Sequence, residues 1–214
     1  PVAEAAHVHT DAAPASDAAA PLGESSAHTH GTEVPITEAQ LTAANSFITQ
    51  VKATVAPFED IRAGMAAGYV QLTQDLPGIA AHFVNVKYLT DGIIMDPTKP
   101  EFLLYTKRLD GNWRLVGTMF YDEKAGDTAP SFFGPLDVWH LHEDLCFTGP
   151  SVRVVATAAD CKGGNFVAKT AWQLHVWTAP GSAGVFSHDF APINPGAFPG
   201  ATQTAAQDLA ASTR

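Results

Sequence analysis

The feature that most constrains the fold is a change in hydrophobic period near residue 70. Between residues 37 and 68, apolar side chains recur at intervals of three and four, which is typical of helices that pack on a core. From Gln71 onward, apolar and polar residues alternate in short segments bounded by Gly, Pro and Asp, which is typical of strands. Helices followed by strands predict an α+β fold, with an N-terminal helical pair packed on an antiparallel β-sheet or half-closed barrel.

Two helices are predicted before the strands. Thr37 and Gln40 form a capping-box pattern, so the first helix begins there. Its buried face carries Leu41, Ala44, Ile48, Val51 and Val55. Pro57 ends this helix and begins a second one, which ends at Gly68. The buried face of the second helix carries Phe58, Ile61 and Met65.

The clearest pair of strands is a hairpin. Residues 102–108 and 113–121 are joined through Asp110-Gly111, a dipeptide that takes the positive φ of a tight turn at little cost. Further strands are predicted over residues 82–88, 138–147, 152–157 and 166–177.

The chain of 214 residues predicts one domain with two tails. Residues 1–34 are rich in Ala, Pro, Ser and Asp, so we expect a disordered tail. Its histidines form two His-x-His pairs, His7 with His9 and His28 with His30, which either capture Zn²⁺ or Cu²⁺ weakly or are incidental to a spacer. Residues 35–195 form a single α+β metal-binding domain, and residues 196–214 a C-terminal tail.

The net charge and the two cysteines limit which classes of partner and which cellular compartment the sequence favours. A net charge of −10 opposes the phosphate neutralisation that nucleic-acid binding needs, and no apolar run is long enough for membrane insertion. The chain begins at Pro1, so we expect a mature, secreted or periplasmic protein. Cys146 and Cys161 suit a disulfide in such a compartment, although two reduced, buried thiols are the alternative.

Histidines carry the chemical signal. In the segment from Trp139 to Cys146, alternation places His140 and His142 on one strand face, roughly 6.6 Å apart along the strand. Two imidazoles at that spacing can reach one metal ion, although a solvent-facing polar pair is the simpler alternative. The same alternation puts Cys146 on the histidine face, where a thiolate ligand would compete with the disulfide. Glu143 is a candidate ligand, second-shell partner or surface charge.

A later strand supplies a third histidine. In the segment from Trp172 to Trp177, alternation places Gln173, His175 and Trp177 on one face. If this strand neighbours the one that carries His140 and His142, three imidazoles converge, a set that suits zinc, copper or non-haem iron.

The chain also carries a series of motifs in order along residues 60 to 194. They are Gly68-Tyr69, Ala81-His82-Phe83-Val84-Asn85, Pro100-Glu101-Phe102-Leu103-Leu104-Tyr105, Trp113-Arg114-Leu115-Val116-Gly117, Trp139 to Cys146, Trp172 to Trp177 and Gly184-Val185-Phe186-Ser187-His188. They resemble the GYHFVNP-like, PE-x-L-x-Y and LHVW…GVF landmarks of a largely uncharacterised family of exported bacterial proteins. Ala81 and Val86 depart from the Tyr and Pro that are frequent in that pattern.

This resemblance implies a shared pocket that involves His82, Glu101, His140, His142 and His175, without implying a reaction. A weaker similarity to cupins, which carry His-x-His and a later histidine, keeps a cupin-like β-barrel as the alternative architecture. The cupin pattern places several residues between the second histidine and its carboxylate, whereas Glu143 follows His142 directly.

The predicted function is therefore that of an exported transition-metal-binding protein. Its ligands are His140, His142 and His175, with His82 as the fourth, and zinc is favoured over copper or iron. One alternative is a metal-dependent hydrolase or other metalloenzyme that acts on a small substrate, with Glu101 or Glu143 as the catalytic carboxylate. The other is an aromatic-lined module that binds a small-molecule ligand and whose histidines only form hydrogen bonds.

Overall fold

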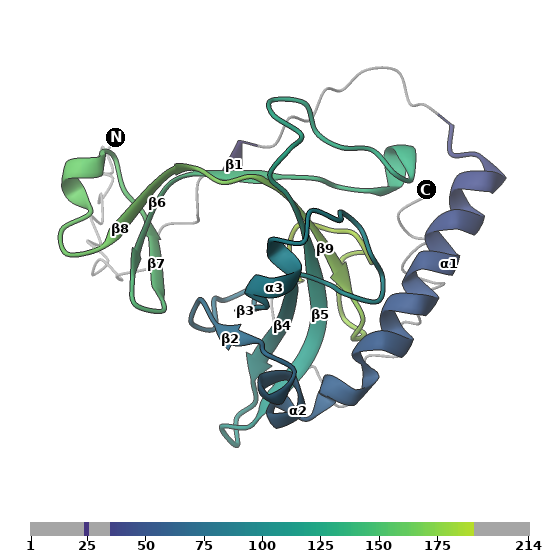
Figure 1. Cartoon of the computed structure of the whole chain (residues 1–214), viewed down its shortest axis with the longest axis horizontal. Helices are drawn as coiled ribbons and strands as arrows, with labels where there is room; N and C mark the ends of the chain where they lie inside the picture. The colour runs from purple at the N-terminus through teal and green to yellow at the C-terminus, as the bar shows by residue number, and fades with distance from the viewer. Residues whose placement is uncertain (1–23, 26–34, 191–214) are drawn as a thin grey trace, which may run out of the picture.

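The computed structural model describes residues 24–25 and 35–190, and these residues form the predicted α+β fold (Figure 1). A long N-terminal helix lies beside a five-stranded antiparallel sheet, and a smaller antiparallel sheet extends from the other side. Apart from Glu24 and Ser25, the predicted tails at residues 1–34 and 196–214, with all four tail histidines, lie outside the described residues. No helix of the described part has the length and apolar character needed to cross a membrane.

Helix α1 spans Glu38–Val55 and begins with the predicted capping box. The Thr37 hydroxyl accepts a hydrogen bond from the Gln40 amide at 3.2 Å, and the Gln40 side chain accepts one from the Thr37 amide at 2.9 Å. These two bonds satisfy backbone donors that the first helical turn cannot pair. The buried residues of the helix are Ala44, Phe47, Ile48, Val51 and Val55.

The predicted second helix is shorter than expected. The 3₁₀ turn η1 covers Ala56–Glu59, and α2 covers only Ile61–Ala66, with Asp60 as its N-cap. Phe58 and Ile61 pack against the main core as predicted. The prediction for Met65 was wrong, because its side chain is exposed and Gly64 is the buried residue of α2. Six residues make too few turns for a continuous apolar face.

The larger sheet has the strand order β2-β3-β4-β5-β9. Its strands are β2 Val70–Gln71, β3 Ala81–Val84, β4 Phe102–Lys107, β5 Trp113–Asp122 and β9 Trp172–Trp177. The predicted hairpin is β4 and β5, and Gly111 takes a φ of +81° in its turn. The strand predicted over residues 82–88 ends early, because Asn85 caps the short helix α3 Val86–Leu89.

The smaller sheet is built around β6 Leu141–Thr148, which pairs with β7 Ser151–Val154 and β8 Asn165–Lys169. The two-residue strand β1 Glu24–Ser25 pairs with the start of β6. Short 3₁₀ turns, η2 Gly134–Leu136 and η3 Ala158–Asp160, lie in the connecting loops. The single strand predicted over residues 166–177 is in fact two strands, β8 and β9, which belong to different sheets. The sheets do not close into a barrel, so the described residues show the predicted antiparallel sheet and not the cupin-like β-barrel that was its alternative.

The two faces of the larger sheet have different neighbours. One face packs with α1 in the main core, where Phe47 and Phe120 lie 5.1 Å apart between ring centroids. The other face carries a second apolar cluster that includes Phe102, Met119 and Trp177. Strand alternation puts His82 and His175 on this second face, because they are in register with Leu104 and Met119 respectively. The second face therefore holds the histidines.

Candidate metal centre

A bridge between the two sheets brings the predicted histidines together. His140, immediately before β6, pairs with Gln173 of β9 through His140 N–H to Gln173 O at 3.0 Å and Gln173 N–H to His140 O at 2.7 Å. The Thr170 amide donates to the carbonyl of His142 at 2.9 Å. The condition set by the sequence, that the two histidine-bearing strands be neighbours, is met.

Alternation then sorts the side chains as predicted. Trp139 and Leu141 point into the main core, and His140 and His142 lie on the opposite face. The ring of His175 lies 4.8 Å from that of His140, measured between centroids, and 4.9 Å from that of Trp177. The two strands thus contribute three neighbouring imidazoles.

A further histidine, His188, comes from the loop after β9. This loop folds back along the strand: the Trp177 amide donates to Val185 O at 2.8 Å, and the Trp177 indole N–H donates to Ser187 O at 2.8 Å. His175 Nδ1 donates to the carbonyl of His188 at 2.6 Å. These bonds hold the His188 ring 4.2 Å from that of His140 and 5.4 Å from that of His142.

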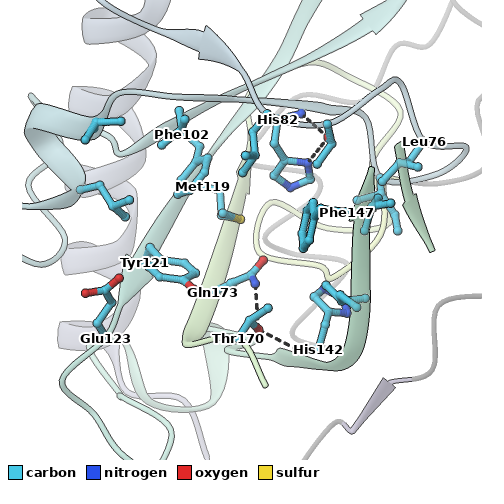
Figure 2. Close-up of a pocket in the computed structure, with 18 residues that line it drawn as sticks. Leu76, His82, Phe102, Met119, Tyr121, Glu123, His142, Phe147, Thr170 and Gln173 are labelled. Carbon is cyan, nitrogen blue, oxygen red and sulfur yellow. Dashed lines mark hydrogen bonds between the residues drawn. The ribbon is translucent and has the colours of Figure 1, made fainter. Parts of the chain in front are cut away.

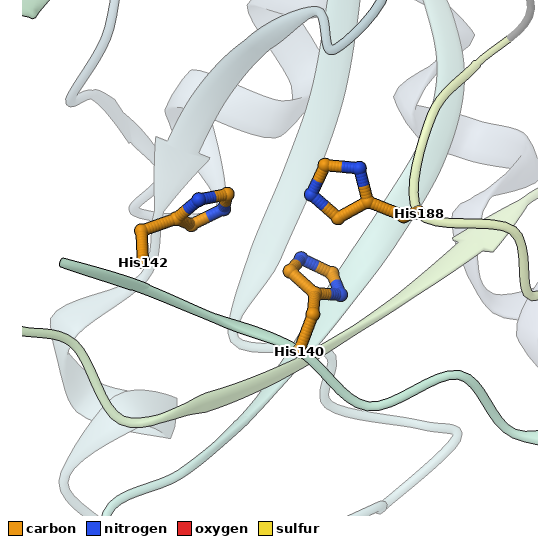
Figure 3. A group of neighbouring side chains, drawn as sticks. All are labelled: His140, His142 and His188. Carbon is orange, nitrogen blue, oxygen red and sulfur yellow. The ribbon is translucent and has the colours of Figure 1, made fainter. Parts of the chain in front are cut away.

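The candidate centre consists of His140, His142 and His188, and we call it the histidine triad (Figure 3). One ring nitrogen of each lies within 4.8 Å of the others, so a single ion could be held between them. Figure 3 shows His140 and His142 rising from one chain segment and His188 facing them from another, with the three rings turned toward a common space. Two of the side chains are buried and His188 is half-buried.

Hydrogen bonds indicate which ring nitrogens remain as ligands. His140 Nδ1 donates to Val138 O at 3.3 Å, which leaves Nε2 with a lone pair. That Nε2 and Nδ1 of His142 are buried, and neither has a hydrogen-bond partner among the residues that the structure describes. A buried polar atom without a partner is costly, and a metal ion would remove that cost. An imidazole that donates from one nitrogen to a carbonyl is also the usual arrangement of a metal-bound histidine.

His175 lies beside the triad rather than in it. Its Nδ1 bond to His188 O leaves Nε2 buried, with no partner within the described part of the chain. The group of ligand atoms that meet within 4.8 Å does not include it. Its clearest role in the structure is to hold the loop that carries His188.

Electrostatics favour neutral imidazoles. Burial, together with the smaller effect of neighbouring imidazoles, lowers the pKa of His82 to about 3 and that of His142 to about 4. Burial is also the main cause that lowers the pKa of His140 and of His175 well below the ordinary value. Neutral imidazole is the form that binds metals, so these side chains are ready to bind at neutral pH.

His82 lies next to His175, with their ring centroids 5.7 Å apart. Its backbone N–H donates to Thr73 Oγ1 at 2.9 Å, and its ring Nδ1 lies 3.3 Å from the same oxygen. His82 is not among the ligand atoms that meet in the triad, so its role as fourth ligand remains a prediction.

The predicted carboxylates lie elsewhere. Glu101 is 2% exposed, and strand alternation places it with Leu103 and Tyr105 on the α1 face of the sheet, opposite the histidines. Burial raises its pKa to about 8. Glu143 is exposed on β6, opposite Lys169 of β8. The carboxylate that does contact the triad is Asp189, whose Oδ1 lies 2.9 Å from His188 Nδ1.

Cys146 is not on the histidine face, so this prediction was wrong, and it forms the predicted disulfide with Cys161. The physical reason is Asp144, which interrupts β6 with a φ of +57°. This residue reverses the alternation, so Leu145 and Phe147 share the pocket side with His142 while Cys146 points away. Asp tolerates the left-handed conformation better than most residues.

A pocket of about 340 Å³ adjoins the triad, and His142 is part of its wall (Figure 2). The pocket lies between the second face of the larger sheet, which contributes Phe102 and Met119, and the smaller sheet, which contributes Leu145 and Phe147. Its polar lining includes Thr170, whose hydroxyl accepts from the His142 amide at 2.9 Å and from the Gln173 side chain at 3.1 Å.

Sequence reasoning missed His188 as a ligand. It lies in a loop without periodicity, so no pattern could say which way its side chain points. The available signal was the motif Gly184-Val185-Phe186-Ser187-His188, which was recognised as a landmark without assigning His188 to the shared pocket.

Comparison with known proteins gives no relative from which the role of the site could be inferred. No family model, no curated protein and no solved structure matches this chain. The resemblance to exported bacterial proteins and to cupins therefore stays a prediction. What is established is an α+β fold with a histidine triad that could hold a metal ion, beside a pocket.

Proposed function

We propose that this protein binds a transition metal ion through His140, His142 and His188. The observation that carries this proposal is the convergence of three imidazole nitrogens within 4.8 Å, with burial lowering the pKa of two of the three, His140 and His142. Three imidazoles that converge from two separate segments, two of them buried, serve no evident packing purpose, since apolar rings would fill the same space at lower cost.

Zinc is the favoured ion, with copper and iron as alternatives. Imidazole suits all three metals, and a three-histidine set is a common arrangement for zinc with one position left for water or another ligand. A thiolate ligand would favour copper. The sulfur of Cys146 is bonded to that of Cys161, so the described residues offer no free thiol as a ligand.

A location outside the cytoplasm is consistent with this metal-binding function. A disulfide persists in an oxidising compartment, so the Cys146–Cys161 bond supports a secreted or periplasmic location. Binding, sequestration or delivery of a metal outside the cytoplasm is the role that joins these two observations.

A metalloenzyme is the second candidate function, and the pocket is the observation that favours it. A metal held by three ligands keeps an open position, and the wall of the pocket includes one of the three ligands. The predicted carboxylates do not line this pocket, so Glu101 and Glu143 are not supported as its general base. Among the described residues that line the pocket, the only carboxylate is that of the exposed Glu123.

The test compares two full-length chains that carry no affinity tag. In the first, the four tail histidines are replaced by Ala; in the second, His188→Ala is added. Calorimetric titration with Zn²⁺ should find one tight equivalent in the first chain. In the second, that equivalent should be lost or weakened at least a hundredfold, because two histidines alone hold zinc poorly.

His82→Gln in the tail-substituted chain is the matched control. It removes a buried histidine on the same sheet face that lies outside the triad: the tight equivalent should remain if the triad alone holds the ion, and should weaken if His82 is the predicted fourth ligand. Equal zinc affinity with and without His188 would refute the triad as the site. Elemental analysis of protein purified without chelators would then show whether metal is bound anywhere.

A further inference from the structure

The pocket beside the triad has a composition that restricts its occupant. Most of the wall is apolar, formed by residues that include Phe102, Met119, Leu145, Phe147 and Val152. The polar residues of the lining include the triad member His142, with His82, Thr170 and Gln173. Figure 2 shows His142, Thr170 and Gln173 grouped together, with Phe147 between His142 and His82. An occupant must therefore have an apolar body and one polar end.

Charge decides the nature of that polar end. The described residues that line the pocket include no Lys or Arg, so an anion has no side-chain partner of opposite charge there. A divalent ion bound by imidazoles keeps its positive charge, because metal-bound imidazole is neutral. Asp189, which contacts His188, is half exposed and offsets only part of that charge. The metal is thus the group in this pocket that can pair with an anion.

We propose that the pocket binds a small apolar monocarboxylate whose carboxylate coordinates the metal held by the histidine triad. This inference rests on the proposed metal-binding function. The open position of a three-histidine site accepts an oxygen ligand, and carboxylate oxygen is a common ligand of zinc. The apolar body then occupies the space between the two sheets, next to Met119 and Phe147.

The remaining features of the pocket agree with this orientation. Glu123 carries the only carboxylate among the described lining residues and is exposed, so it repels a carboxylate from that side of the pocket. A cationic head would be repelled by the metal at the other end. A volume of about 340 Å³ is at the small end of ligand pockets, so the occupant is a medium-chain or single-ring acid rather than a long lipid.

The experiment uses octanoate as the probe and the full-length chain, both metal-free and loaded with one equivalent of Zn²⁺. Calorimetry should give an octanoate dissociation constant at least tenfold lower for the zinc-loaded chain. By linkage, octanoate should lower the zinc dissociation constant by the same factor. 1-Octanol, which has the same chain and no charge, should bind with an affinity that zinc does not change. In a Co²⁺-loaded chain, octanoate should also alter the visible absorption spectrum, which reports on the ligands of the ion.

Two substitutions on β7 separate the pocket from the metal. Val152→Trp fills the pocket and should abolish octanoate binding while one zinc equivalent stays bound. Val154→Trp, on the same strand and outside the lining, should change neither the octanoate affinity nor the zinc stoichiometry. If Val152→Trp does not fold, judged by its thermal unfolding, the Co²⁺ spectrum of the unsubstituted chain still decides the question.

The outcomes distinguish the two proposals. If zinc binds at one equivalent but octanoate binds equally with and without zinc, or not at all, this inference is wrong and the metal-binding function stands. If 1-octanol shows the same dependence on zinc as octanoate, the carboxylate is not the metal ligand and the inference is again wrong. If the chain binds no metal, both proposals are wrong.

Discussion

His175 Nδ1 donates a hydrogen bond to the backbone carbonyl of His188 at 2.6 Å. The strand residue that the sequence marks as a ligand thus holds the loop that supplies the third member of the triad. Since His175 is completely buried, its ring cannot move without disturbing its neighbours. The relation makes His175 a positioning residue for the metal centre.

His175→Phe should weaken zinc binding by ten- to a hundredfold, because loss of a second-shell hydrogen bond typically has that effect. His175→Asn is the matched control: its amide N–H occupies a place similar to Nδ1 and can still donate to His188 O. Calorimetric titration of both variants with Zn²⁺ checks the prediction. Equal weakening in both would show that His175 is itself a ligand.

His140→Ala with His142→Ala should remove the tight zinc equivalent, whereas replacing the four tail histidines by Ala should remove only weak binding. The sheet holds its ligands in place, but a site in a chain rich in Ala, Pro and Ser must also offset the entropy lost on ordering. Zinc stoichiometry and affinity, measured for both variants in the full-length chain, check this contrast. Loss of the tight equivalent with the tail histidines would move the site to the tail.

The Cys146–Cys161 bond should contribute to stability without contributing to the metal centre. Its ends are 15 residues apart in sequence, which corresponds to roughly 3 kcal/mol of unfolding free energy on the loop-entropy model. Cys146→Ser with Cys161→Ser should therefore lower the denaturation midpoint. Because Cys146 points away from His142, the double variant should keep its zinc equivalent. Denatured, unreduced protein should show no titratable thiol, and a thiol that zinc protects would contradict this assignment.

Glu101 should make the protein less stable as pH rises. Burial raises the pKa of Glu101 in the folded chain to about 8, above its ordinary value of 4.5. Between these values the folded chain holds a proton that the unfolded chain has lost, so the free energy of unfolding falls as pH increases from 4.5 to about 8.

Glu101→Gln, which stays neutral, should remove that fall, and the variant should gain stability relative to the unsubstituted chain as pH rises. Denaturant unfolding at pH 5, 6.5 and 8 is the measurement; each pKa unit corresponds to about 1.4 kcal/mol. Glu143→Gln is the control, since this exposed side chain has no burial cost to relieve. Parallel stability curves for the Glu101→Gln and unsubstituted chains would contradict the buried, protonated state.

Local pattern determined much of this protein. The capping box at Thr37 and Gln40 starts α1, and Asp110-Gly111 closes the β4–β5 hairpin, because both depend on neighbours within a few residues. Strand alternation placed His140 with His142, and Gln173 with His175, because successive side chains of a strand point to opposite faces. The cysteine pair favoured the disulfide, with two reduced thiols as the alternative, and the structure contains the disulfide.

Tertiary structure decided the rest. Alternation cannot foresee the positive φ of Asp144, which turns Cys146 away from the histidines, or the break after Lys169 that sends β8 and β9 to different sheets. It also could not show which face of the sheet α1 covers, and so that Glu101 lies away from the histidines. His188 depends on hydrogen bonds from Trp177 and His175 to a folded-back loop. The sequence by itself determined which strand faces carry imidazoles, whereas contacts between distant segments decided which imidazoles meet.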